Sequence, residues 1–139
     1  MNIAAAYAYM GYCYRNKADY YSAQEYFLKA IGICEDKGIR KSLDLFYEDL
    51  GYNHYLKGEY ELAEESFHKS SRLYDEFGTY WLRSIGESCL VMINLRKGDY
   101  KKAMEHYHRA EIFSSKDSVK EEMAVLEEAR EQIRLFKLM

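Results

Sequence analysis

The stretches KADYYSA (17–23), KGEYELA (57–63) and KGDYKKA (97–103) begin 40 residues apart and share a Lys, an acidic residue, a Tyr and an Ala. Further positions correspond at the same interval on both sides of these stretches. They include Phe27, Phe67 and Tyr107, then Ala30, Ser70 and Ala110, and upstream Gly11 and Gly51. Self-similarity at a fixed period of this length is the signature of a repeat architecture. The chain is therefore expected to consist of three related units.

Apolar and small residues recur at intervals of three and four in both halves of each unit, which is the pattern of one helix face. The second half of the first unit, for example, carries Tyr20, Ala23, Phe27, Ala30 and Cys34. No proline interrupts the chain. The spacing predicts an all-α solenoid of three antiparallel helix pairs and a C-terminal capping helix. The expected helices lie near 3–16, 20–37, 41–57, 60–77, 80–97, 100–115 and 118–137.

The repeated stretch itself is expected to be a structural turn. The Gly of KGEY and KGDY follows the last turn of one helix, where a left-handed residue costs least without a Cβ atom. The next residue is an acid at the position where an N-cap accepts backbone N–H groups, and the Tyr begins the following helix. The opening motif thus describes the scaffold and indicates no chemistry.

Composition excludes several classes of protein. The chain has 139 residues, of which 48% are hydrophobic and 31% are charged, so it is expected to fold. Its net charge of −3 comes from acids and bases mixed along the whole length, which argues against direct nucleic-acid binding. The uncharged N-terminal run is too short to span a membrane as a helix and has no basic segment before it. We expect a soluble, cytoplasmic protein that does not bind membranes.

No pattern of residues indicates catalysis, a cofactor or a metal. The sequence contains no nucleophile elbow, P-loop, zinc-protease motif or dinucleotide-binding glycines. His106 and His108 are two residues apart on an expected helix, so they point in different directions and do not share one ion. The three cysteines are an odd number without a CxxC pair, which is typical of small core residues. We predict a protein that is not an enzyme and has no cofactor.

The repeat pattern resembles the tetratricopeptide repeat (TPR) family in its longer, 40-residue variety. The resemblance covers nearly the whole chain, although the family's usual unit has 34 residues and ends with a Pro that is absent here. In the second unit it rests on Tyr47, Leu50, Gly51, Gly58, Glu59, Tyr60, Ala63 and Phe67. It implies a single TPR-like domain over 1–139, with repeats at about 1–39, 40–79 and 80–117 and a capping helix at 118–137.

The resemblance also implies where a ligand binds, because the first helix of each TPR unit lines a concave groove. The mapped groove is mainly aromatic and aliphatic and consists of Tyr12, Arg15, Asn16, Leu45, Glu48, Tyr52, Tyr55, Ser88, Met92 and Arg96. The cationic residues with which some TPR domains hold a C-terminal carboxylate are missing from their positions. We expect a protein-protein interaction module that binds a peptide or a helix segment. The alternative is a structural or oligomerisation segment of a larger signalling or transcription-regulatory TPR protein, with no free ligand.

The first expected helix is apolar on every side from Ile3 to Tyr14, which is typical of a helix that is buried all round. Its own unit and the next one cover only part of it. Ala6, Tyr9 and Cys13 mark the remaining face, where a preceding helix would stack. We therefore expect either that the chain is the C-terminal piece of a longer repeat protein or that two copies pair through this helix as a homodimer.

Overall fold

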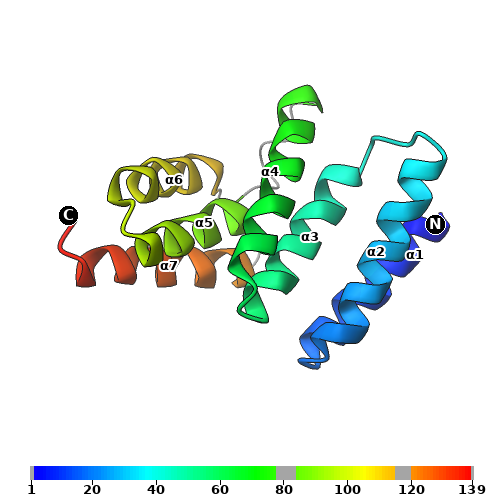
Figure 1. Cartoon of the computed structure of the whole chain (residues 1–139), viewed down its shortest axis with the longest axis horizontal. Coiled ribbons are helices and arrows are strands. Elements are labelled where there is room, and N and C mark those ends of the chain that lie inside the picture. The colour runs from blue at the N-terminus through cyan, green and yellow to red at the C-terminus, as the bar shows by residue number, and fades with distance from the viewer. Residues whose placement is uncertain (1, 78–83, 115–119, 139) are drawn as a thin grey trace. The chain divides into compact units, whose positions relative to one another are not determined.

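The computed structural model describes residues 2–77, 84–114 and 120–138, and these residues form seven α-helices and no strand (Figure 1). The helices are α1 (Ile3–Asn16), α2 (Tyr20–Asp36), α3 (Leu43–Leu56), α4 (Tyr60–Phe77), α5 (Ser84–Lys97), α6 (Tyr100–Phe113) and α7 (Lys120–Leu135). The pairs α1 with α2, α3 with α4 and α5 with α6 pack antiparallel, and α7 packs mainly against α5. The predicted all-α fold of three helix pairs and a terminal helix is confirmed.

The helices divide into two compact units, α1–α4 and α5–α7, which are described separately. The predicted single domain over 1–139 stays a prediction. Most helix ends agree with the sequence pattern to within two residues. The third helix begins at Leu43 rather than 41 because Ser42, just before it, has a left-handed backbone with φ 72°. The expected helix starts at 80 and 118 and the expected helix end at 115 fall outside the described residues.

The repeated turn has the conformation that the sequence predicts. Gly58 and Gly98 have positive φ angles of 81° and 75°, and Ala18 occupies the equivalent site with φ 61° despite its Cβ atom. Asp19 and Asp99 each accept a hydrogen bond of 3.1 Å from a backbone N–H in the first turn of the following helix. Glu59 has a longer side chain and reaches backwards, where its Oε1 lies 3.0 Å from both His54 Nδ1 and Lys57 Nζ.

The core of the first unit depends on close contact between paired helices. Phe27 is fully buried against Gly11, where an added Cβ atom would lie 2.7 Å from the ring. Phe67 and Gly51 repeat this contact between α3 and α4, with the same 2.7 Å approach. The 40-residue correspondence of these positions therefore reflects a packing requirement, because only a glycine lets each phenylalanine ring approach the facing helix.

The second unit has its own core between α5, α6 and α7. Its buried cluster consists of Val91, Leu95, Ala103, Tyr107, Ala110, Leu126, Ala129 and Ile133. The Tyr107 hydroxyl accepts a hydrogen bond of 2.9 Å from Arg130 Nε of α7 and donates one of 3.1 Å to Glu111. The terminal helix is thus joined to the third pair by apolar packing and by a polar contact. Cys34 and Cys89 are buried, as expected from the sequence for small core residues, and Cys13 is half-buried.

Candidate interaction surface

Four tyrosines and one arginine form a continuous row across α1, α3 and the start of α4 in the first unit. The Arg15 guanidinium lies 5.0 Å from the ring centre of Tyr12 and 4.9 Å from that of Tyr52. Tyr52 stacks on Tyr55 with ring centres 6.4 Å apart, and Tyr55 meets Tyr60 at 5.6 Å. We call this row, Tyr12, Arg15, Tyr52, Tyr55 and Tyr60, the aromatic ladder.

The helix period explains how the ladder is assembled. Tyr12 and Arg15 are three residues apart on α1, and Tyr52 and Tyr55 are three apart on α3, so each pair shares one helix face. Arg15 is only 5% exposed, and its Nη1 lies 3.5 Å from Asp49 Oδ1 of α3. The Asp49 carboxylate and the two aromatic ring faces stabilise this guanidinium, which burial has removed from water. The guanidinium is therefore held in one position between two aromatic rings.

The members of the aromatic ladder differ in how far they are exposed to solvent. Tyr12 is 40% exposed, Tyr55 is half-buried, and Asn16, one residue beyond Arg15, is exposed at the end of α1. Tyr52 is buried beneath them. Of the groove positions mapped from the sequence, the structure thus brings Tyr12, Arg15, Tyr52 and Tyr55 together in direct contact, and Asn16 follows Arg15 at the exposed end of α1.

The other two mapped positions of α3 lie nearer its N-terminus. Leu45 is half-buried, and Glu48 is buried where it accepts a hydrogen bond of 2.5 Å from the Tyr74 hydroxyl of α4. Burial and the Glu48 charge raise the pKa of Tyr74 well above its ordinary range, so this hydroxyl stays a donor. Glu48 therefore joins α3 to α4, a role that the sequence did not indicate.

The mapped positions of the second unit all lie on α5. Ser88 and Met92 are buried, and Arg96 is exposed in the last turn of the helix. Sequence reasoning also missed two participants in the first unit. Asp49 pairs with Arg15, and Tyr60, which the repeat assigned to the turn, extends the ladder. The 40-residue pattern could not reveal either contact, because both depend on how side chains meet between helices.

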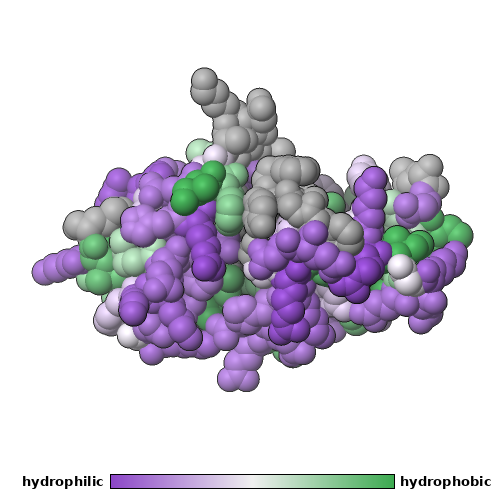
Figure 2. Space-filling model, turned by 90° about the horizontal axis from the view of Figure 1, so that it is seen from above, coloured by the Kyte–Doolittle hydropathy of each residue, from purple (hydrophilic) through white to green (hydrophobic). Residues whose placement is uncertain are grey.

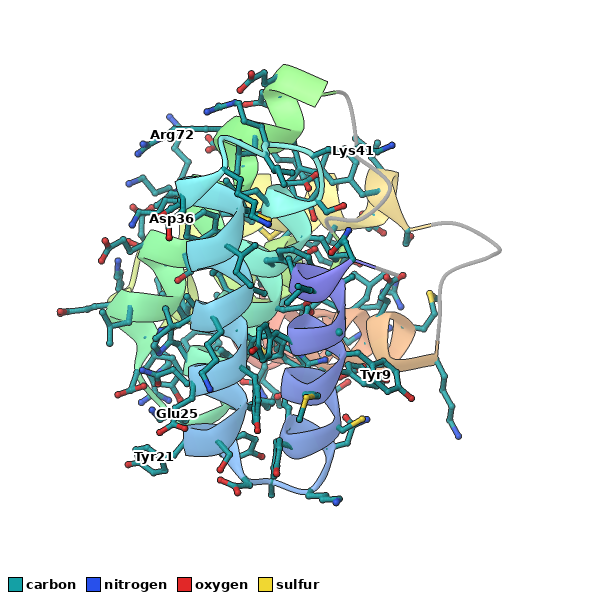
Figure 3. The ribbon with its side chains drawn as sticks, turned by 90° about the vertical axis from the view of Figure 1, so that its right-hand side faces the viewer. Tyr9, Tyr21, Glu25, Asp36, Lys41 and Arg72 are labelled. Carbon is teal, nitrogen blue, oxygen red and sulfur yellow. The ribbon has the colours of Figure 1, made fainter. Side chains whose placement is uncertain are left out.

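A second accessible surface is the outer face of α1, which contains the predicted self-association residues. Ile3 and Tyr9 are 63% and 64% exposed, Met10 is also exposed, and Ala6 and Cys13 are half-buried. Tyr9 projects from the side of α1 that faces away from α2 (Figure 3). The face shown in Figure 2 is mostly hydrophilic, with hydrophobic spots at separate places.

Ionisable side chains also contact one another within each unit. His54 and Lys57 share Glu59, and His106 Nδ1 of α6 lies 2.6 Å from Glu87 Oε2 of α5. Within the described ranges, no three metal-ligating side chains come together. The hydrogen bonds from His54 and Lys57 lower the pKa of Glu59. These contacts join neighbouring parts of the helical scaffold.

No protein-family model matches the chain, and no curated protein matches it significantly. Among the helices of the described residues, none combines the length and the apolar character needed to cross a bilayer.

Proposed function

We propose that this chain is a TPR-like helical-repeat module that binds a peptide or helix segment of another protein. The TPR assignment is supported by the left-handed turn at the same place in each unit, by the aspartate caps and by the repeated contact of glycine with phenylalanine. A cytoplasmic module without enzymatic activity and without a cofactor is part of the same proposal. Nucleic acid and membranes are not among its proposed partners.

The aromatic ladder is the observation that supports binding most directly. Tyrosine and arginine are the side chains that most often dominate the energy of protein interfaces. In this chain they are already stacked and partly buried, so a partner would order few side chains on docking and lose little entropy. Tyr12 and Tyr55 supply accessible ring surface, and the exposed Asn16, next in sequence to Arg15, supplies a polar group.

The ladder also indicates the chemistry of the partner. Its one cation, Arg15, is nearly buried and contacts Asp49, so the accessible part of the ladder is mainly apolar ring surface. A segment with aromatic or branched apolar side chains fits such a surface better than a highly charged one. Binding is therefore expected to weaken only slightly between low and moderate salt, because screening acts on exposed charges.

The test uses peptides selected from a random library by display against the intact chain. Isothermal titration calorimetry then compares the unmodified protein with the double variant Tyr12→Ala, Tyr55→Ala. We expect at least about a tenfold loss of affinity, as for truncation of interface hot spots. Tyr21→Ala is the matched control, because Tyr21 is 75% exposed on α2 outside the ladder. Equal affinities for all three proteins would refute the assignment of the ladder as the binding surface.

A second function, self-association through α1, is favoured by the internal repeat. Ile3, Ala6 and Met10 correspond at 40 residues to Leu43, Phe46 and Leu50, which are buried in the core cluster shared with α2. The outer face of α1 thus has the pattern of a face that elsewhere in this chain contacts a helix. It fits a structural segment of a larger signalling or transcription-regulatory protein, or a homodimer.

Sedimentation velocity distinguishes this second function. A dimer of the unmodified chain that becomes a monomer in Tyr9→Glu would support pairing through α1. A chain that is monomeric at high concentration, or a dimer unaffected by the substitution, would refute it. Ile112→Glu is a matched control, since Ile112 is also a large hydrophobic residue and is 75% exposed on α6.

A further inference from the structure

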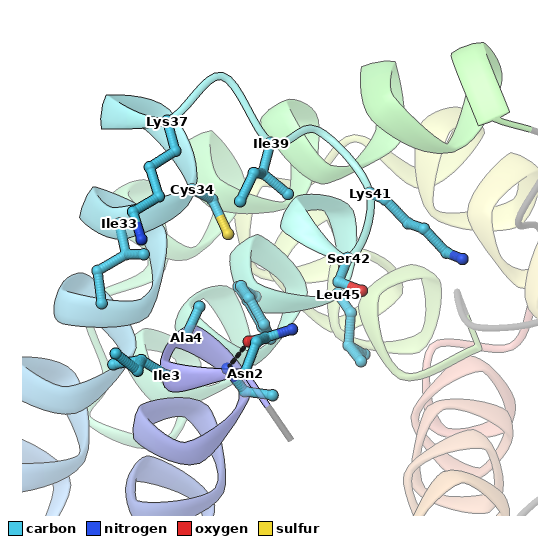
Figure 4. A pocket seen from close by; sticks show the side chains of 12 residues that line it. Asn2, Ile3, Ala4, Ile33, Cys34, Lys37, Ile39, Lys41, Ser42 and Leu45 are labelled. Carbon is cyan, nitrogen blue, oxygen red and sulfur yellow. Dashed lines mark hydrogen bonds between the residues drawn. The ribbon is translucent and has the colours of Figure 1, made fainter.

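A pocket of about 450 Å³ opens where the first turns of α1 and α3 meet the last turn of α2 (Figure 4). It exists because α2 is 17 residues long and α1 only 14, so the end of α2 and the connection over 37–42 extend past the start of α1. Its lining consists of Asn2, Ile3, Ala4, Ala5, Ile33, Cys34, Lys37, Ile39, Lys41, Ser42, Leu45 and Phe46.

The interior of this pocket is apolar. Cys34 and Phe46, which are almost fully buried, belong to its lining, and Ile39 lies over it from the connection between α2 and α3 (Figure 4). Burial raises the pKa of the Cys34 thiol, with a smaller effect from Glu35, so the sulfur is neutral. A neutral thiol among aliphatic and aromatic side chains offers few hydrogen bonds to water, so an apolar ligand group can displace that water favourably.

The charged groups of the lining all have one sign. Lys37 and Lys41 are exposed at the rim, and among the described residues that line the pocket there is no carboxylate. Lys37 runs back along α2 towards Ile33, whereas Lys41 is turned outwards (Figure 4). The nearest acid in sequence to Cys34, Glu35, accepts a hydrogen bond from the Tyr47 hydroxyl. An apolar interior with two ammonium groups at the opening is complementary to a ligand with an apolar chain and an anionic end.

We propose that this pocket binds a small aliphatic carboxylate, with the acyl chain inside and the carboxylate at Lys37. The volume limits the length: at about 30 Å³ per water-sized group, 450 Å³ holds at most roughly 15 heavy atoms. A monocarboxylate of about eight to ten carbons, with about ten to twelve heavy atoms, fits within this limit. Lys37 supplies the first charge contact, and rotation of Lys41 towards the opening supplies a second. The site is separate from the aromatic ladder and does not depend on peptide binding.

Octanoate is the probe, titrated into the intact isotope-labelled chain and followed by amide chemical shifts. We expect saturable binding with a dissociation constant below about 1 mM, with shifts concentrated at the lining residues. Octanol, which has the same chain without the charge, and octyltrimethylammonium, which carries the opposite charge, should bind at least about threefold more weakly. Equal affinity for octanoate and octanol would refute the role of the lysines. Shifts spread over the surface without saturation would refute the site.

Two variants test the site from opposite sides. Lys37→Ala together with Lys41→Ala should remove the preference for octanoate over octanol while leaving the apolar interior intact. Lys101→Ala, an exposed lysine on α6, is the matched control and should change nothing. Ala5→Phe should fill the pocket and abolish binding of both probes. If that variant fails to fold, as judged by its thermal transition, the lysine pair decides the matter, because both lysines are exposed. Unchanged preference in the double lysine variant would overturn the proposal.

Discussion

The first two helix pairs and the third carry different residues at the same repeat positions. Gly11 faces Phe27 and Gly51 faces Phe67, whereas the third pair has Val91 and Tyr107 at these sites, both buried in one cluster. Glycine lets a phenylalanine ring lie directly on the facing helix. In the third pair Val91 takes the place of this glycine, so other contacts fill the core of that pair.

The third pair finds its additional contacts in the terminal helix. Tyr107 adds a hydroxyl that Phe27 and Phe67 lack, and this hydroxyl bonds to Arg130 of α7. The repeat thus preserves the helix pair and its turn, while the contact between the paired helices differs according to the helix that packs next to the pair. The terminal pair is specialised because it is completed by a single helix.

We expect the largest effect from replacing Gly51 of the second pair by valine, the residue at the equivalent position of the third pair. In Gly51→Val the new side chain would collide with the buried Phe67 ring, which an added Cβ atom already approaches to 2.7 Å. We expect a loss of about 3 kcal/mol or more in the free energy of unfolding, measured by urea denaturation.

The control for this substitution is Gly32→Ala on α2, where an added Cβ atom meets nothing within 4 Å. It should stabilise the protein by up to about 1 kcal/mol through helix propensity. A small effect of Gly51→Val would show that Phe67 can move aside and that the glycine is not needed for packing.

A smaller effect is expected in the third pair. Tyr107→Phe removes the hydroxyl that accepts from Arg130 and donates to Glu111. We expect a loss of about 1 to 2 kcal/mol, as for a hydrogen bond to a charged group, together with faster amide exchange in α7. Phe67→Tyr would introduce the same hydroxyl in the second pair without this partner. Unchanged exchange in α7 would contradict the proposed link between the third pair and the terminal helix.

The turns give a comparison that depends on pH. His54 and Lys57 lower the pKa of Glu59, so its ionised form is favoured in the folded state. A lowered carboxyl pKa contributes stability that is present above the unfolded value, near 4.5, and is lost as the pH falls through the folded value. Glu59→Gln should flatten the decline in melting temperature below about pH 5 relative to the unmodified chain. The same decline in melting temperature at low pH in both proteins would mean that the contacts of Glu59 with His54 and Lys57 do not persist in solution.

The smallest effect concerns the first turn. Ala18 has φ 61°, a conformation that costs a residue with a Cβ atom about 1 kcal/mol, whereas the equivalent Gly58 and Gly98 avoid this cost. Ala18→Gly should therefore stabilise the protein by about 0.5 kcal/mol after the greater entropy of glycine in the unfolded chain is deducted. Gly58→Ala should have the opposite sign. A destabilising Ala18→Gly would show that this turn is not strained.

The parts of the structure that the sequence predicted are those set by local rules. Helix periodicity and the turn residues predicted the bounds of the helices in the described ranges accurately, because both signals act within a few residues. The start of α3 was missed because the left-handed Ser42 has no glycine to signal it. Contacts between helices could not be predicted from these local rules. The stacking of Arg15 between Tyr12 and Tyr52, for example, depends on how α1 and α3 pack. The pocket near Cys34 likewise depends on the relative lengths of α1 and α2.

The most direct test of the account asks which tyrosine rings touch a bound peptide. Intermolecular nuclear Overhauser effects between a selected peptide and the tyrosine ring protons of the intact chain measure this contact. We expect effects at Tyr12 and Tyr55, the accessible members of the aromatic ladder. Effects confined to Tyr9 or Tyr21, with none at the ladder, would contradict it.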